Sequence, residues 1–333
     1  MTSNHFLICA AALSGILATS CGHNAPSPPP YDHTRPLGQG RCDPAGPGPG
    51  VHFRSAEIGG HLRIWQIHVP KGAKAASRAP VVMAFHGGMG TAQSLMSRAG
   101  LAQKAEEAGF ILVAPEGTGT FQTWNAGNCC GYARREGVDD VLFVRHMLAA
   151  LDAEFCVDPD RIYATGHSNG AMLSYRLACE AADLVAAIAP VGGASGQLDR
   201  ALDPPADAYP CAPSRPVPVL HIHGSKDGCY RFDGGVGDGP SGVDATSVPE
   251  TLATWGALNG CGEGREITLR QGAATCEARE GCAADTILCT IDGAGHVWPG
   301  RNDYPSLRIC GGTTTDDLDA NDLMWSFFAS HPR

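Results

Sequence analysis

The residues best suited to chemistry lie in a short glycine-flanked turn, Gly166-His167-Ser168-Asn169-Gly170. An apolar strand-like run, RIYAT, precedes this turn, and a run with helical spacing follows it. A serine placed this way is typical of a nucleophile elbow, where a sharp strand-to-helix turn exposes the hydroxyl at a helix N-terminus. The pattern predicts that Ser168 is a nucleophile for acyl transfer.

A serine hydroxyl needs a base, and the base needs a carboxylate to orient it. In this kind of fold the acid and then the histidine follow the serine along the chain, each after a strand. Asp227 follows the run VLHIH, and His296 lies in a glycine-rich loop after the run TILCTI. We therefore expect Asp227 and His296 to complete a triad, in preference to Asp233 or Asp238, and we expect the two strand histidines to be structural.

An oxyanion hole requires two backbone N–H groups aimed at the reacting carbonyl oxygen. The residue after the nucleophile, Asn169, is expected to supply one of them. The glycine-rich loop that follows Val81–Phe85 is expected to supply the other, from Gly88 or, as second choice, Met89. No Lys-Ser/Thr pair follows these glycines, so a phosphate-binding loop is disfavoured.

Short apolar runs alternate with segments of helical periodicity along most of the chain. The expected strands cover residues 61–69, 81–85, 110–114, 161–165, 184–191, 217–223 and 286–291. The expected helices cover residues 91–108, 139–155, 169–182, 248–258 and 317–330. This alternation predicts an α/β fold with a mostly parallel central sheet and helices on both faces. Such sheets bind ligands beyond the carboxyl ends of their strands, where the residues singled out above lie.

The composition narrows the classes of protein further. The 333 residues carry 24 basic and 34 acidic side chains, a net charge of −10, which argues against nucleic acid as a partner. No apolar run is long enough to span a membrane. We expect a single catalytic domain over residues 51–333, acting as a monomer and without a metal or other cofactor.

The N-terminal segment indicates export. Residues 1–20 contain the apolar run FLICAAALSGILAT and are interpreted as a signal peptide. The sequence ATSC that ends at Cys21 is similar to a bacterial lipobox, so acylation of Cys21 and a lipid-only membrane attachment are expected, the alternative being an ordinary signal peptide. Residues 22–50 are rich in Pro and Gly and predict an extended linker.

The cysteine content fits an exported protein. Of 14 Cys, Cys9 lies in the predicted signal peptide and Cys21 is the predicted lipid site, which leaves an even set of twelve. Such a density predicts up to six disulfides, whose pairing the sequence does not define. We expect the adjacent Cys129 and Cys130 to bond to two different partners. No Cys-x2-Cys pair recurs with His at zinc-ligand spacing.

Several segments together resemble the secreted poly(3-hydroxybutyrate) depolymerase-like and feruloyl or acetylxylan esterases of carbohydrate esterase family 1. The matching segments are AFHGG, WNAGNCCGYA, GVDDVLFVRHML, YATGHSNGAMLSYRLACE, IAPVGG, PVLHIHGSKD, SVPETLATW and IDGAGHVWPG. The resemblance implies an α/β-hydrolase fold, metal-free hydrolysis of carboxylic esters, and a triad of Ser168, Asp227 and His296.

The substrate implied by this resemblance is a feruloyl or acetyl ester on a plant polysaccharide, or alternatively a hydroxyalkanoate oligomer. We expect His86, Trp124, His167 and Trp298 to line the substrate pocket, although the two tryptophans could instead pack inside loops. A serine peptidase on the same fold and a non-catalytic surface binding protein are the more distant alternatives.

Overall fold

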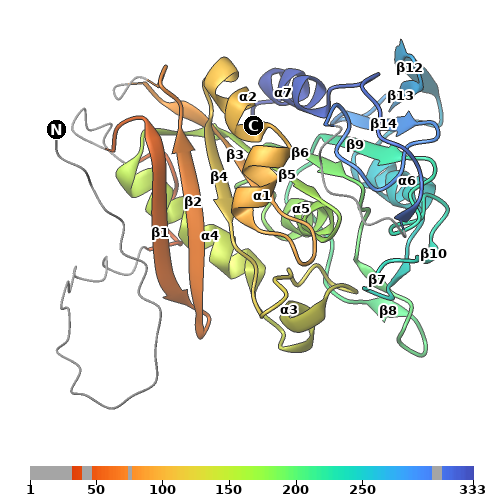
Figure 1. The fold of residues 1–333 in the computed structure, drawn as a ribbon, viewed down its shortest axis with the longest axis horizontal. Coiled ribbons are helices and arrows are strands. Elements are labelled where there is room, and N and C mark those ends of the chain that lie inside the picture. Colours follow the sequence, from red (N-terminus) through yellow and green to blue (C-terminus); the bar gives the residue numbers. More distant parts are fainter. Residues whose placement is uncertain (1–31, 40–46, 74–76, 302–309) are drawn as a thin grey trace, which may run out of the picture. The chain divides into compact units, whose positions relative to one another are not determined.

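The computed structural model describes residues 32–39, 47–73, 77–301 and 310–333 (Figure 1). The predicted signal peptide, Cys21 and Cys42 lie outside the described residues. A ten-stranded sheet runs through the domain in the order β1-β2-β4-β3-β5-β6-β9-β14-β13-β12. The strands of this sheet are β1 (Gly50–Ile58), β2 (His61–Val69), β3 (Ala79–Phe85), β4 (Ile111–Pro115), β5 (Val157–His167), β6 (Ala187–Val191), β9 (Val219–Gly224), β12 (Arg265–Gln271), β13 (Ala274–Arg279) and β14 (Thr286–Ile291).

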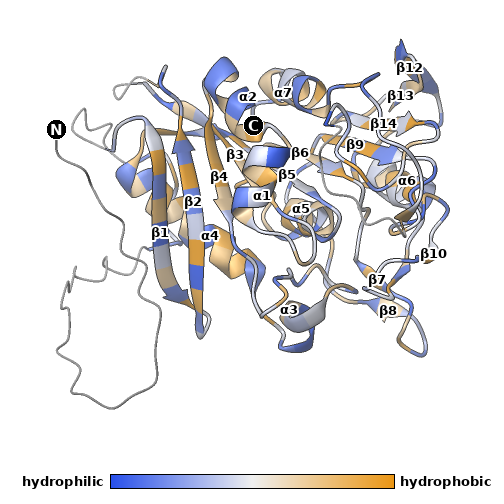
Figure 2. Cartoon of the chain, in the orientation of Figure 1, coloured by the Kyte–Doolittle hydropathy of each residue, from blue (hydrophilic) through white to orange (hydrophobic). Residues whose placement is uncertain are grey.

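The middle of the sheet is parallel and its two edges are antiparallel. All neighbouring pairs from β4 to β14 run parallel, whereas β1 and β2 at one edge and β13 and β12 at the other pair antiparallel. Every residue of β4 and β6 is buried, as expected for strands covered on both faces, while hydrophilic and hydrophobic residues alternate along β1 and β2 (Figure 2).

Helices cover both faces of the sheet, which confirms the predicted fold class. One hydrophobic core lies beneath α1 (Ala92–Arg98), α2 (Leu101–Ala108) and α7 (Ala320–Ser330). A second core lies beneath α4 (Asp140–Glu154), α5 (Asn169–Glu180) and α6 (Val248–Leu258). Among the described residues, no helix has both the length and the apolar character needed to cross a bilayer.

The loops beyond the carboxyl ends of the strands carry small elements of their own. These are α3 (Gly131–Arg135) and two two-stranded sheets, one of β7 (Leu198–Asp199) with β8 (Ala206–Asp207) and one of β10 (Gly235–Val236) with β11 (Asp244–Ala245).

Some elements differ from the sequence-based expectation. The single helix expected over residues 91–108 is two helices, because Gly100 adopts a left-handed conformation (φ 68°) that ends α1 and starts α2. Strands β1, β12 and β13 were not predicted; β12 is almost entirely exposed, so it lacks the apolar pattern on which such a prediction depends.

Part of the segment predicted to be a linker contacts the domain. The Gly38 N–H donates to Asp152 Oδ1 of α4 over 3.0 Å, and Arg78 donates to the Gly38 carbonyl. The rings of His33 and His146 are 4.1 Å apart. Residues 32–39 are therefore part of the folded unit rather than an extended spacer.

Disulfides tie several loops to the sheet and to each other. The bonded pairs are Cys129–Cys130, Cys179–Cys211, Cys229–Cys310, Cys261–Cys282 and Cys276–Cys289. Cys156 is also disulfide-bonded. The expectation that Cys129 and Cys130 bond to different partners is wrong. Consecutive side chains usually point to opposite sides of a chain, but the peptide bond here is cis and both point the same way.

A buried ion pair anchors the loop that precedes α3. Arg63 of β2 donates to Asp140 Oδ1 over 2.7 Å, and the side chains are 1% and 0% exposed. The other oxygen of Asp140 accepts the Asn125 N–H over 2.7 Å. The guanidinium also lies 3.8 Å from the centre of the Phe143 ring. These contacts fix the Trp124–Asn125 backbone against α4.

Replacing only one partner of this ion pair is expected to destabilise the folded protein. We predict that Arg63→Met lowers the free energy of unfolding by about 3–5 kcal/mol, because Asp140 stays buried without its cation. The double variant Arg63→Met/Asp140→Leu should recover part of that loss. Urea unfolding measures both; a cost below about 1 kcal/mol for the single variant would contradict this account.

Candidate active site

Ser168 lies on a strained turn between β5 and α5, as the sequence predicted. Its backbone has φ 56° and ψ −120°, a conformation that most residues avoid. The two flanking glycines make the turn possible. A Cβ on Gly170 would lie 2.0 Å from the Phe85 carbonyl oxygen, and one on Gly166 would lie 2.6 Å from the Gly170 carbonyl oxygen. Any larger residue at either position would push the turn away from β3.

Asp227 and His296 meet although 69 residues separate them. They follow β9 and β14, which are parallel neighbours, so their loops emerge at the same edge of the sheet. His296 Nδ1 donates to Asp227 Oδ2 over 2.7 Å. The Cys229 and Tyr230 N–H groups donate to Asp227 Oδ1 over 2.9 and 2.8 Å. The carboxylate can thus hold the imidazole in one tautomer and orientation.

The environment keeps Asp227 ionised. Burial raises its pKa, but the charge of His296 and hydrogen bonds from His223 and His296 outweigh burial and hold the pKa well below its usual range. A charged Asp227 can stabilise an imidazolium at His296 when that ring accepts a proton.

Two further histidines and a tyrosine continue the hydrogen-bond chain behind Asp227. His223 Nε2 faces the Tyr230 carbonyl at 2.8 Å and Asp227 Oδ2 at 3.4 Å, both acceptors, so this nitrogen must carry the proton. His223 Nδ1 then accepts from His221 Nε2 over 3.0 Å, and His221 Nδ1 accepts from the Tyr175 hydroxyl over 2.8 Å. The two strand histidines are buried, as expected, and these contacts connect them to Asp227.

Ser168 and His296 line the same cavity of about 810 Å³. His86 and His167 also line it, in agreement with their predicted place in the pocket. The His167 and His296 rings are 4.5 Å apart. Burial, and then the charge of His296, lower the pKa of His167 well below its usual value, so His167 contacts His296 as a neutral ring.

The expected oxyanion-hole residues border this cavity. Asn169 is the first residue of α5, where a backbone N–H has no acceptor within the helix. Gly88 lines the cavity, and a Cβ there would approach only Thr123, at 4.0 Å. The Met89 N–H donates to the Gln122 carbonyl over 2.8 Å, so the second choice is already occupied. The geometry favours Gly88 and Asn169 as the pair of donors.

His86 fixes the loop that carries Gly88. Its Nδ1 donates to the Gly87 carbonyl over 2.8 Å, and its Nε2 accepts the Gly117 N–H over 3.0 Å, which defines a neutral tautomer. Burial lowers the pKa of His86 from 6.5 to about 4, although hydrogen bonds to Gly87 and Gln122 oppose the shift. A proton on Nε2 would break the bond from Gly117.

The predicted role of the two tryptophans in the pocket is not supported. Trp124 and Trp298 are 0% and 1% exposed, and neither lines the cavity. Trp124 donates from its ring to the His86 carbonyl over 2.9 Å, and Trp298 donates to Asn321 over 2.9 Å. Both rings instead pack inside the protein, where their N–H groups donate hydrogen bonds to buried acceptors.

Two exposed apolar side chains line the cavity, although the sequence analysis did not expect them to do so. Phe121 is 71% exposed and Met89 is 47% exposed, and both line the cavity. Both side chains are therefore available to contact a ligand in the cavity. The available signal was a lone Phe in the otherwise polar, glycine-containing run GTGTFQT, which no periodicity argument selects.

Across residues 32–39, 47–73, 77–301 and 310–333, no cluster of three or more His, Cys, Asp or Glu is arranged to bind a metal ion.

Comparisons with known proteins agree with this fold. No family model matches the chain. It is 32% identical over 292 residues to "Putative esterase NocK" of Nocardia uniformis subsp. tsuyamanensis, a match that covers 82% of this chain and 81% of that protein. It is 33% identical over 238 residues to feruloyl esterase B of Piromyces equi, covering 69% of this chain but only 42% of that protein.

More distant matches extend the comparison. The chain is 31% identical over 140 residues to poly(3-hydroxyalkanoate) depolymerase C of Paucimonas lemoignei, covering 40% of this chain and 32% of that protein. The acetyl xylan esterase from Aspergillus awamori aligns in structure with a TM-score of 0.53 at 17% identity, over 74% of this chain and 94% of that one. That likeness supports the fold alone.

The sheet, the helices on both its faces and the turn at Ser168 define an α/β-hydrolase. Within that class, the chain belongs to the family of esterases that includes feruloyl esterases and poly(3-hydroxyalkanoate) depolymerases, as its sequence motifs indicated.

The buried neutral His86 should make stability depend on pH. In the unfolded chain His86 takes up a proton below about 6.5, whereas in the folded protein it does so only near pH 4. Stability therefore falls as the pH drops from about 6.5 to 4, by up to about 3 kcal/mol from this group. Thermal unfolding between pH 4 and 7 should show a flatter profile for His86→Gln, and an unchanged slope would contradict this assignment.

Proposed function

We propose that this chain is an exported serine carboxylic-ester hydrolase that cleaves feruloyl or acetyl esters of plant polysaccharides. The observation that carries the proposal is the bonded Asp227–His296 pair in the wall of a cavity that Ser168 also lines, at the start of a helix. Family membership supports ester hydrolysis, and the names of the relatives support this class of ester.

The chemistry proceeds through an acyl-enzyme. Ser168 Oγ attacks the ester carbonyl carbon while His296 Nε2 takes its proton, and Asp227 stabilises the resulting imidazolium. The Gly88 and Asn169 N–H groups donate to the oxyanion, each contributing about 3–4 kcal/mol by analogy with known sites. His296 then returns the proton to the leaving alcohol. Water then attacks the acyl-enzyme carbonyl carbon while His296 takes its proton. The bond between that carbon and Ser168 Oγ breaks to release the acid, and His296 returns the proton to Ser168.

The rim of the cavity favours an aromatic acyl group. Phe121 and Met89 are the exposed apolar side chains that line the cavity, and a phenolic ring can stack on Phe121. Hydroxyalkanoate oligomers are the competing substrate class, because the chain also matches poly(3-hydroxyalkanoate) depolymerase C over 140 residues.

Export is part of the proposal. Disulfides such as Cys229–Cys310 persist in oxidising compartments outside the cytoplasm. We place the mature enzyme in the cell envelope, held by an acylated Cys21. Incorporation of a labelled fatty acid into the full chain, and its absence in Cys21→Ser, tests the anchor separately from activity.

The first test compares methyl ferulate, 4-nitrophenyl acetate and 4-nitrophenyl butyrate as substrates of the wild type and of Ser168→Ala. We expect methyl ferulate to be preferred, and Ser168→Ala to reduce kcat by about 10⁴-fold or more. Preference for the butyrate would favour hydroxyalkanoates. Turnover that does not depend on Ser168 would overturn the serine-esterase assignment.

A second test addresses the acyl group. We predict that Phe121→Ala lowers kcat/KM for methyl ferulate by about fivefold, because stacking on an aromatic ring contributes about 1 kcal/mol. Hydrolysis of 4-nitrophenyl acetate should not change, since acetate is too short to reach the rim. Leu62→Ala, at another exposed apolar position, on β2 and outside the cavity, is the control. Equal losses on both esters would contradict the predicted contact.

A further inference from the structure

A second hollow continues from the catalytic cavity. It has a volume of about 430 Å³, within the range of about 300–1,000 Å³ typical of small-molecule sites. Six residues line both hollows, so the two are contiguous rather than separate. These shared residues are Cys129, Cys130, Gly131, Arg135, Ser241 and Val243.

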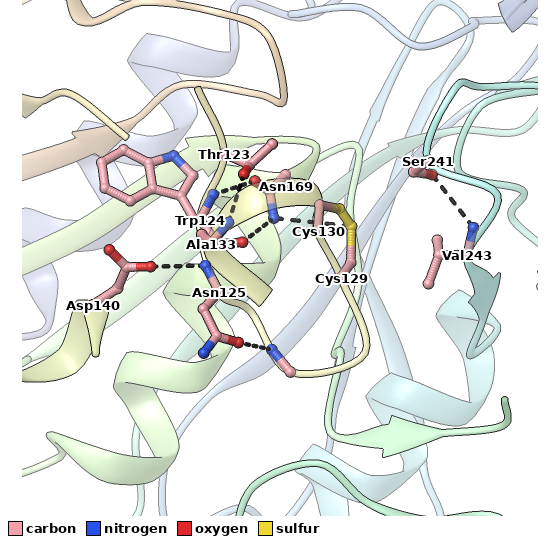
Figure 3. Close-up of a disulfide and its surroundings, with 11 residues drawn as sticks. Thr123, Trp124, Asn125, Cys129, Cys130, Ala133, Asp140, Asn169, Ser241 and Val243 are labelled. Atoms are coloured by element: carbon pink, nitrogen blue, oxygen red, sulfur yellow. Dashed lines mark hydrogen bonds between the residues drawn. A yellow bond between two sulfur atoms is a disulfide. The ribbon is translucent and has the colours of Figure 1, made fainter. Parts of the chain in front are cut away.

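The Cys129–Cys130 disulfide lies where the two hollows meet. In Figure 3 the disulfide lies between Asn169 on one side and the Ser241–Val243 turn on the other. Asn169 is the residue next to Ser168, and Ser241 and Val243 belong to the loop before β11. A ligand that extends from Ser168 into the second hollow must therefore pass over the disulfide.

Both walls of this passage are fixed relative to the catalytic residues. On one side, Asn169 Oδ1 accepts the Trp124 N–H over 2.7 Å and Asn169 Nδ2 donates to the Trp124 carbonyl over 3.1 Å (Figure 3). The Cys130 N–H also donates to the Trp124 carbonyl, over 3.1 Å. These hydrogen bonds attach the start of the loop that carries the disulfide to α5, the helix that begins after Ser168.

The opposite wall is tied to the triad acid. Cys229, whose N–H donates to Asp227, is disulfide-bonded to Cys310, and Cys229 also lines the catalytic cavity. A Cβ on Gly239, at the start of the loop that carries Ser241, would lie 3.0 Å from Cys229 Sγ. Disulfides and hydrogen bonds therefore hold both walls of the passage in place.

The two ends differ in polarity. The catalytic end has the apolar rim of Met89 and Phe121. The far end is polar, with Asp244 and an ion pair between Arg134 and Asp199. Acidic and basic groups are both present there, which suits a neutral ligand with many hydroxyl groups rather than an ion of one sign.

From this arrangement we propose that the second hollow is a glycan subsite for the alcohol part of the substrate. It is lined by residues 128–131, Arg134, Arg135, Asp199, Ala201 and residues 241–244. The acyl group lies against Phe121, the ester lies at Ser168, and a chain of sugar units crosses the Cys129–Cys130 disulfide into the polar hollow. The subsite rests on the proposed function, because it binds the alcohol part of the same ester.

The test blocks the far hollow without touching the catalytic cavity. Ala201 is exposed and lines only the second hollow, so Ala201→Trp should fill it. Leu202→Trp, at an exposed neighbouring residue that lines neither hollow, is the matched control. The two substrates are methyl ferulate and a feruloylated arabinoxylan oligosaccharide of at least three sugar units.

We expect Ala201→Trp to lower kcat/KM for the oligosaccharide ester by about tenfold, equivalent to about 1.4 kcal/mol, and to leave methyl ferulate unchanged. Leu202→Trp should change neither. Equal effects on both esters, or no effect on either, would overturn the glycan subsite while methyl ferulate turnover still supports the esterase. Absence of Ser168-dependent turnover on every ester would instead overturn the proposed function.

A binding measurement separates the glycan from the competing ligand. Xylotetraose should bind to Ser168→Ala in calorimetric titration, and Ala201→Trp in the same background should abolish that binding. If Ala201→Trp instead reduces hydrolysis of a 3-hydroxybutyrate trimer relative to a 3-hydroxybutyrate monomer ester, the hollow accepts polyester and the glycan assignment is wrong. Thermal unfolding of each variant confirms that the fold is retained.

Discussion

The candidate site depends on one backbone constraint, the close approach of the Ser168 turn to β3. The turn requires a positive φ at Ser168 and no side chain at Gly166 or Gly170, since a Cβ on Gly170 would lie 2.0 Å from the Phe85 carbonyl oxygen. Because the turn is that tight, α5 begins immediately after Ser168 and its first N–H groups face the cavity. The loop after β3 continues from Phe85 and carries Gly88, so the same contact places both candidate oxyanion donors beside Ser168.

The parallel sheet then brings the remaining groups to the same edge. Asp227 and His296 follow adjacent strands. The Asp227 carboxylate accepts hydrogen bonds from His296, Cys229 and Tyr230. Behind it, hydrogen bonds through His223 and His221 to Tyr175 leave each ring with one defined tautomer. The neutral state of His221 is consistent with burial, which lowers its pKa well below the usual value.

Disulfides shape the loops that the sheet leaves free. Two of them, Cys129–Cys130 and Cys229–Cys310, border the cavity, one beside Asn169 and one beside Asp227. A loop without regular structure is otherwise costly to hold in one conformation. The covalent links, together with the hydrogen bonds between Asn169 and Trp124, hold the walls on either side of the polar hollow.

The sequence alone predicts the fold class, the helix over residues 248–258 and the strand over residues 286–291. It also selects Ser168, Asp227 and His296 as the candidate triad. These follow from local periodicity and from motifs in which spacing carries the chemistry. Tertiary structure decided what depends on residues far apart: Trp124 and Trp298 are buried instead of lining the pocket, Phe121 is exposed at its rim, and Cys129 bonds to Cys130. The fold also favours Gly88 over Met89 as the candidate oxyanion donor, because the Met89 N–H donates to the Gln122 carbonyl. No spacing in the sequence reveals that hydrogen bond. Burial, disulfide pairing and long-range hydrogen bonds are properties of the assembled fold. The sequence pattern therefore indicates which reactive groups are available, and the fold decides which of them face the cavity.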